Sequence, residues 1–157
     1  MKSIIFTIML SSSIGCCGIA AAAEAELMTP IHQFIDDFNK GDVKGAAAAH
    51  MDSVSIIDEL PPHLWRGPGA FQAWTKALEA DAKKNAVTDE SVTVGDPTYS
   101  VVSGRRAYVV VPASFTFKQK GAAMKEAAQM TYVLQKGAAG WKIAAWTWVG
   151  SPPAPAK

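Results

Sequence analysis

The stretch AAMKEAAQMTYVLQKGAAGWKIAAWTWVG, residues 122–150, decides the fold class. It holds two runs of alternating residues, 122–136 and 141–150, joined by a glycine-rich turn at 137–140. A period of two around such a turn predicts an antiparallel β-hairpin. In the second run both alternating sets are apolar: one set is Trp141, Ile143, Ala145, Thr147 and Val149, and the other is Ala144, Trp146 and Trp148. We therefore expect a last strand that is covered on both faces.

The same alternation extends upstream and predicts two more strands, 91–101 and 105–118. Turns at Ser103-Gly104 and Lys120-Gly121 separate the strands from one another. Pro112 lies inside the second of these runs and has no N–H for the ladder, so it predicts a bulge or kink that would curve the sheet.

Helical signals come before these strands. Thr29-Pro30 predicts a helix start, and an apolar stripe at helical spacing follows, formed by Ile31, Phe34, Ile35 and Phe38. Gly41 predicts the end of this helix, and Asp42 predicts the cap of a second helix over 43–50.

A short strand over 54–60 and a third helix from about 67 to 85 complete the expected elements. Pro61-Pro62 closes the strand, and the helix carries an apolar side formed by Phe71, Trp74, Leu78 and Ala82. Helices followed by apolar strands predict an α+β domain, with about three helices packed on a curved, mainly antiparallel sheet. The domain is expected over 26–150, and the proline-rich tail 151–157 is expected to be disordered.

The first 25 residues have the pattern of a secretory signal peptide. Lys2 precedes an apolar run, and Ala23-Glu24-Ala25 is a small-x-small cleavage site. A retained membrane anchor is the alternative, but the apolar run is shorter than a bilayer span requires. Cys16 or Cys17 could instead be acylated in a lipoprotein, although no leucine lies three places before Cys16. We expect a periplasmic or secreted protein whose mature chain has no cysteine and no membrane span.

Composition and motifs exclude several classes. The chain has 157 residues, 49% hydrophobic and 18% charged, with a net charge of +1, which argues against disorder and against nucleic-acid binding. It has no dinucleotide fingerprint, phosphate loop, nucleophile elbow or zinc-binding histidine pair. No cofactor and no metal are expected.

Four segments resemble the NTF2-like superfamily: FIDDFNKGD at 34–42, HMDSVSIID at 50–58, Trp65-Arg66-Gly67, and Gly140-Trp141-Lys142-Ile143. The resemblance is strongest to the branch of SnoaL-like cyclases and ketosteroid isomerases, and it covers nearly all of 26–150. It implies a cone-shaped fold with an enclosed pocket. Its motifs specify the fold better than the function, because this fold carries many activities.

The resemblance also implies roles for individual residues. Asp58 matches the general base of ketosteroid isomerases, which takes a proton next to a carbonyl. Phe34 and Gln129 match the tyrosine and the protonated aspartate of the family's oxyanion hole, and His50 matches a pocket tyrosine. Phe34 has no donor and Gln129 has only an amide, so steroid isomerisation by the family's usual mechanism is not expected.

Each candidate also has a structural interpretation. Asp58 could cap the turn at Pro61-Pro62, and His50 could interact with a helix dipole. The other pocket candidates have structural alternatives too. His63 would lie on the surface of its loop, Trp65 and Trp74 would belong to the core or an interface, and Thr131 would lie with Gln129 on a solvent-facing side of its strand.

Three functions remain open. The first hypothesis is an exported domain that binds a small apolar or amphipathic molecule. The second is a cofactor-independent isomerase, cyclase or dehydratase with Asp58 as base. The third is a non-catalytic interaction module that uses the sheet. A homodimer through the exposed sheet face is expected, unless a curved sheet wraps these aromatic residues into its own core.

Overall fold

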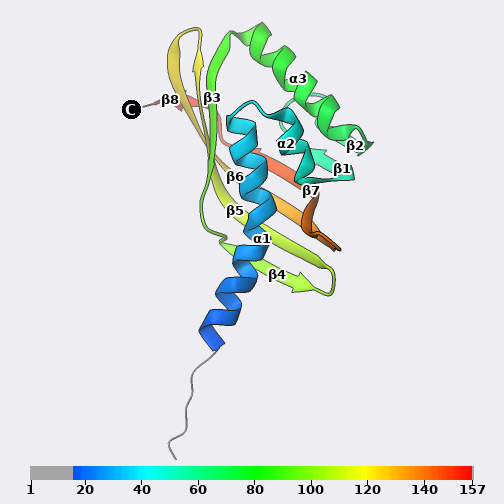
Figure 1. Ribbon diagram of the computed structural model, residues 1–157. Coiled ribbons are helices and arrows are strands. Elements are labelled where there is room, and N and C mark those ends of the chain that lie inside the picture. Colours follow the sequence, from blue (N-terminus) through cyan, green and yellow to red (C-terminus); the bar gives the residue numbers. More distant parts are fainter. Residues whose placement is uncertain (1–15, 157) are drawn as a thin grey trace, which may run out of the picture.

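The computed structural model describes residues 16–156, in which three helices pack on an eight-stranded sheet (Figure 1). The helices are α1 (Cys16–Asn39), α2 (Val43–Ala48) and α3 (Ala70–Asn85). The strands are β1 (His50–Ile57), β2 (Leu64–Pro68), β3 (Val87–Val94), β4 (Tyr99–Ser103), β5 (Arg106–Gln119), β6 (Ala122–Gly137), β7 (Gly140–Gly150) and β8 (Ala154–Pro155).

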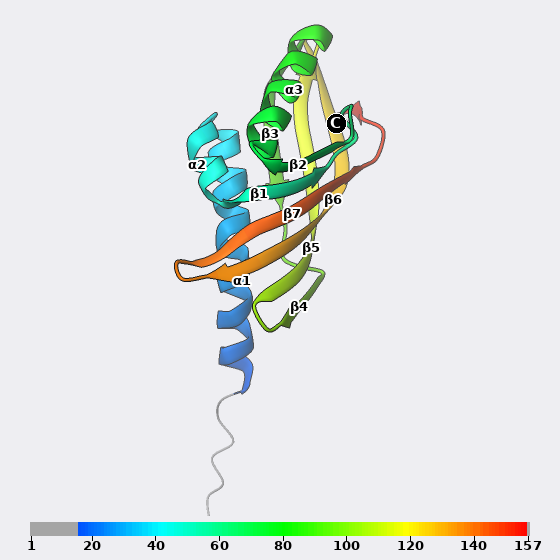
Figure 2. The ribbon, with the colours of Figure 1, turned by 90° about the vertical axis from the view of Figure 1, so that its right-hand side faces the viewer.

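The sheet is open, curved and mixed. Its strand order is β2-β1-β7-β6-β5-β3, while β4 also pairs with β5 and β8 with β6. The neighbours β1 and β7 are parallel, and the other pairs are antiparallel. In Figure 2 the strands β7 and β6 cross in front of α1. The expected α+β class is confirmed, with a sheet that includes one parallel pair.

One face of the sheet, called the inner face below, carries the core. Strand residues on this face are buried, among them Val109, Val111, Met130, Tyr132 and Leu134. α1 packs against β7 and β3, and α3 packs against β1, β2 and β3. The stripe predicted on the first helix is confirmed, because Ile31, Phe34 and Ile35 are buried. No helix in residues 16–156 is long and apolar enough to span a bilayer.

The helix starts and ends differ from two expectations. α1 begins at Cys16 rather than at Thr29, and the Thr29 hydroxyl donates back to the Ala25 carbonyl at 3.0 Å instead of capping a new helix. Pro30 therefore lies inside α1. Asp42 does cap α2, but α2 ends at Ala48 and His50 opens β1.

Three features of the strands also differ from what the sequence predicts. Residues 91–101 belong to two strands, β3 and β4, which pair with successive parts of β5. Pro112 lies between those two paired parts, where no ladder N–H is needed, and the β5–β6 register continues through it without a bulge. Residues 64–68, which have no predicted strand, form β2 by pairing with β1.

The strongest deviation from simple alternation is in β7. Val133 pairs with Ala145 and Leu134 with Ile143, so Ala144 has no partner in β6. This bulge reverses the alternation and buries both Ile143 and Trp146, which the sequence pattern assigns to opposite faces.

Residues 151–156 of the tail lie along β6. Ser151 N donates to Ala127 O at 2.9 Å and Ala156 N donates to Ala123 O at 3.0 Å. β7 ends opposite Ala128, so the preceding part of β6 has free ladder groups that β8 pairs with.

Candidate functional site

A cavity of about 80 Å³ lies on the inner face, between α1, α3 and the sheet. Its walls are almost entirely apolar, and Asp58 and Glu59 are its charged lining residues. The remaining lining residues are Phe34, Ile35, Phe38, Trp74, Leu78, Val92, Phe115, Met130, Trp146 and Trp148.

Aromatic rings form much of the cavity wall and hold one another in place. Trp74 meets Trp146 edge to face, with ring centroids 4.9 Å apart, and Phe34 lies 5.6 Å from Trp146. Phe115 meets Trp148 edge to face at 6.3 Å. Such contacts stabilise aromatic pairs beyond their burial alone. The wall is therefore a packed structure in which aromatic rings border a small space.

Asp58 follows the last residue of β1 and is held by two donors. The Trp74 indole Nε1 donates to its Oδ2 at 3.0 Å, and the backbone N of Leu60 donates to its Oδ1 at 2.8 Å. Burial raises the pKa of Asp58, and the hydrogen bonds from Leu60 and Trp74 act in the opposite direction. The carboxylate is thus fixed in orientation at the cavity.

A second carboxyl, Glu126, lies on the inner face of β6 and is 2% exposed. The Trp148 Nε1 donates to its Oε1 at 2.7 Å. Burial raises the pKa of Glu126, and the hydrogen bond from Trp148 lowers it. Two indole N–H groups of the cavity wall therefore hold two carboxyls.

Glu59 lies between these two groups. Burial, together with the charges of Glu126 and Asp58, raises the pKa of Glu59 to about 7. No Lys, Arg or His in residues 16–156 forms an ion pair with Asp58, Glu59 or Glu126. The three carboxyls, called the carboxyl cluster below, thus have no basic ion-pair partner in the described part of the chain.

Three of the predicted pocket residues line this cavity: Phe34, Asp58 and Trp74. His63 does not; it lies in the loop after Glu59, exposed, with its Nδ1 3.2 Å from the Asp58 carbonyl oxygen. Trp65 is buried on β2 away from the lining.

Gln129 and Thr131 lie on the other face of the sheet, called the outer face below. Their neighbours Met130 and Tyr132 are buried, whereas Gln129 is exposed and Thr131 half-buried. Residues alternate between faces along a strand, so neither side chain reaches the cavity. Gln129 and Thr131 are accordingly not among the residues that line this cavity.

His50 is a satisfied core residue and does not line the cavity. It is 2% exposed, its Nδ1 donates to Ala46 O at 2.8 Å, and its Nε2 accepts from the Trp146 indole at 3.1 Å. This pattern requires the neutral imidazole, and burial lowers the pKa of His50 to about 4. With both ring nitrogens occupied, His50 supports the wall rather than contacting a ligand.

Sequence reasoning missed Glu126 and gave Glu59 no role. The sequence does contain a signal for Glu126. It is separated by even numbers of residues from Met130, Tyr132 and Leu134, so its carboxyl lies on the same, apolar face of the strand. For Glu59 no pattern was available, because it acquires its environment from Glu126, which is 67 positions away in the chain.

Among residues 16–156, no group of three or more His, Cys, Asp or Glu side chains is arranged to hold a metal ion.

The chain was compared with known proteins. The SnoaL-like domain matches residues 27–155. No curated protein matches in sequence. An NTF2-like superfamily protein from Salmonella enterica serovar Typhimurium has a similar structure, with TM-score 0.68 and 18% identity over 88% of this chain and 94% of that one.

Two other solved structures share the fold. A ketosteroid isomerase-like protein from Erwinia carotovora atroseptica has TM-score 0.63 and 19% identity, over 82% of this chain and 97% of that one. LinA has TM-score 0.71 and 12% identity, over 87% of this chain and 91% of that one. At these identities the likeness establishes the fold alone.

Proposed function

The chain belongs to the SnoaL-like domain family, and from that premise we propose that it binds a small apolar or amphipathic molecule in the inner-face cavity. The observation that carries this proposal is a cavity with aromatic walls and a few convergent polar groups, the usual composition of a small-molecule site. The volume of about 80 Å³ is smaller than the roughly 150 Å³ of a protein cavity that encloses benzene, so a bound ring would extend out of the cavity past the exposed side chain of Glu59.

Cyclohexanol is a suitable first probe of this cavity. A ligand that binds only the native state raises its stability, by about 2.7 kcal/mol at a concentration 100-fold above Kd. We expect cyclohexanol to raise the Tm and to shift NMR signals of Phe34, Trp74 and Trp146. Absence of both effects would contradict the proposal.

A cavity-filling variant tests the location of binding. Leu78→Phe adds bulk at a half-buried lining position on α3 and is expected to weaken cyclohexanol binding about tenfold. Leu64→Phe is the matched control, because Leu64 lies 48% exposed on β2 and outside the lining. Equal weakening by both variants would place the ligand elsewhere.

Asp58 supports a second candidate function, a cofactor-independent isomerase, cyclase or dehydratase. Its carboxylate lines the cavity in a fixed orientation, and its pKa is raised by burial, which suits a general base. Asp58 would take the proton next to a carbonyl, the electron pair would pass to the carbonyl oxygen, and a solvent-derived proton would return to carbon.

Deuterium exchange into cyclohexanone in heavy water tests this second function. Exchange catalysed by the protein should be lost in Asp58→Asn and retained in Asp36→Asn, which alters an exposed residue of α1. Catalysed exchange that survives in Asp58→Asn would remove the assigned base.

A homodimer through the outer face belongs to the same proposal, and an interaction module would use this face too. Two adjacent cross-strand rows on it carry only one charge, Arg66 at one end. They are Leu64, Ile57, Thr147, Thr131, Val110 and Tyr99, and Arg66, Ser55, Ala145, Val133, Tyr108 and Val101. Several are exposed apolar side chains, which on a monomer would face water.

Light scattering tests the dimer at micromolar concentration. Val149→Glu, at a position 62% exposed on β7, is expected to shift the protein to monomer. Val43→Glu, 40% exposed on α2, is the control and should leave the mass unchanged. A monomeric unmodified protein would contradict the dimer.

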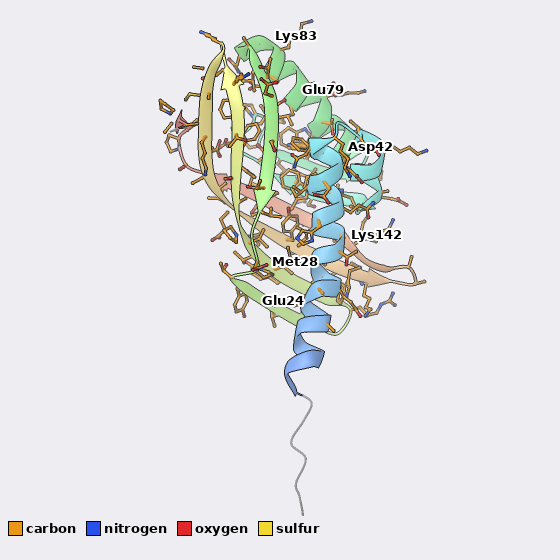
Figure 3. The ribbon with its side chains drawn as sticks, turned by 60° about the vertical axis from the view of Figure 1, so that its left-hand side comes forward. Glu24, Met28, Asp42, Glu79, Lys83 and Lys142 are labelled. Atoms are coloured by element: carbon orange, nitrogen blue, oxygen red, sulfur yellow. The ribbon has the colours of Figure 1, made fainter. Side chains whose placement is uncertain are left out.

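Export to the periplasm or medium is the last part of the proposal. Buried contacts of α1 begin at Leu27 and Met28, while residues 22–26 are exposed. Figure 3 shows Glu24 nearer the free end of α1 than Met28. Cleavage before Glu26 would therefore remove no buried residue among 22–25; residues 1–15 of the predicted signal lie outside the described part. N-terminal sequencing of exported protein should begin at Glu26, and a lipid-modified Cys16 or Cys17 would contradict this.

A further inference from the structure

The buried carboxyl Glu126 poses a charge problem beside the cavity. It is 2% exposed, and its hydrogen-bond partners in the protein are the neutral indole of Trp148 and the carboxyl of Glu59. A buried carboxylate is costly unless it gains a proton or a positive partner. The two neighbouring side chains that act on the pKa of Glu126 are Asp58 and Glu59, and both are acidic. No basic side chain of the described residues forms an ion pair with these carboxyls, so the positive charge that balances them is a proton held by Glu59 in its hydrogen bond to Glu126.

Every other element around the cavity presents uncharged groups. α1 contributes Phe34, Ile35 and Phe38, α3 contributes Trp74 and Leu78, and the strands contribute Val92, Phe115, Met130, Trp146 and Trp148. His63 is the one nearby basic group that affects Asp58, and it is exposed in the loop. A positive charge that could replace this proton is thus not supplied by the cavity wall.

Besides the nearby acidic groups, the cavity wall has aromatic rings, which also attract cations. Trp74, Trp146 and Trp148 line it, and tryptophan faces attract ammonium groups more strongly than other aromatic rings do. The indole N–H groups of Trp74 and Trp148 hold the carboxyls, so the rings and the carboxyls are parts of one assembly.

We propose that the cavity selects an organic cation, an amine or quaternary ammonium compound. Its apolar body would enter the aromatic cavity, and its charged group would lie among Asp58, Glu59 and Glu126. This inference rests on the proposed ligand-binding function and adds the chemical class of the ligand.

The titration of Glu59 fits this assignment. With a pKa of about 7, raised by burial and by the neighbouring carboxyls, Glu59 holds a proton in part of the molecules at neutral pH. A cation would replace that proton as the balancing positive charge. Binding should then release protons and strengthen as the pH rises through 7, as long as the amine itself stays protonated.

Three ring probes of similar size separate the possible ligand classes: cyclohexylammonium, cyclohexanol and cyclohexanecarboxylate. By titration calorimetry at pH 8 and low salt, we expect the ammonium to bind about tenfold more tightly than the alcohol, and the carboxylate most weakly. The advantage of the ammonium should shrink with added salt, because part of the site is exposed.

Two variants assign the preference to the cluster. Glu59→Gln changes a side chain that is partly accessible to solvent, and Glu126→Gln keeps an oxygen that can accept from Trp148. Each is expected to reduce the ammonium-over-alcohol ratio of binding constants several-fold. Glu79→Gln on α3, outside this cavity, is the control and should leave the ratio unchanged.

The outcomes separate the assignment of a cationic ligand from the broader proposal that the cavity binds a small molecule. If cyclohexanol binds and the ammonium binds no more tightly at any pH from 6 to 8.5, the cation assignment is overturned and ligand binding stands. If none of the three probes binds, the proposed function itself fails. An unchanged ratio in both Glu59→Gln and Glu126→Gln would also overturn the assignment to this cluster.

Discussion

The indole of Trp146 donates its Nε1–H to Nε2 of His50 at 3.1 Å, linking β7 to the first residue of the parallel strand β1. The other ring nitrogen of His50 donates to Ala46 O of α2 at 2.8 Å. Trp146 is at the same time a wall of the cavity, so this buried contact joins the core to the candidate site.

Removing the indole donor should destabilise the protein more than removing an indole elsewhere. Trp146→Phe leaves His50 Nε2 buried without a partner, which costs about 1–3 kcal/mol in addition to the lost ring volume. Trp141→Phe, at a half-buried position near the start of β7, is the control. Urea unfolding measures both, and equal losses would contradict the role of the hydrogen bond.

Stability should fall in mild acid because of His50. Its pKa is about 4 in the folded protein and near 6.5 when exposed, so unfolding takes up a proton between these values. The contribution is present in full above pH 6.5 and is lost as the pH falls through 4, amounting to about 3 kcal/mol.

A non-titrating variant isolates this effect. His50→Gln can still donate to Ala46 O and accept from Trp146, and its free energy of unfolding should fall less between pH 6.5 and 4. His32→Gln changes an exposed histidine and should keep the full acid dependence. A His50→Gln curve parallel to that of the unmodified protein would refute the assignment.

Gly150 provides space for the carboxyl of Glu126. A Cβ at this position would overlap the Glu126 carboxyl and crowd Trp148 Nε1. Gly150→Ala should therefore displace Glu126, break its bond to Trp148 and cost about 1–3 kcal/mol. The pKa of Glu59 should fall toward its ordinary value, as NMR titration would detect. Gly137→Ala is the control, since its Cβ would make an ordinary contact at 3.7 Å.

The C-terminal end of α3 offers a stabilising change. Ala86 has a left-handed backbone, with φ 52° and ψ 46°, a conformation that glycine adopts without a Cβ penalty. Ala86→Gly should stabilise the protein by about 0.5–1 kcal/mol. Ala80→Gly, exposed inside α3, should destabilise it by a similar amount. Thermal unfolding would show shifts of opposite sign, and two decreases would contradict the prediction.

Much of the fold could be predicted from local patterns. The hairpin of β6 and β7, the helix α3 and the cap at Asp42 all follow from alternation, helical spacing and turn chemistry, which act over a few residues. Local patterns gave wrong boundaries where pairing decides the structure. β2 is a strand because β1 offers it a partner, and the tail lies along β6 because that strand has a free edge.

The sequence by itself determined the α+β class and the family resemblance, because each depends on a short motif or a regular period, and the resemblance made Asp58 a candidate that lines the cavity. Only the tertiary structure decided the rest of the site. The unpaired Ala144 reverses the alternation of β7 and buries Ile143 and Trp146 on one face. The chain between Glu59 and Glu126 folds so that two carboxyls meet, and their mutual repulsion and burial exist only after that contact has formed.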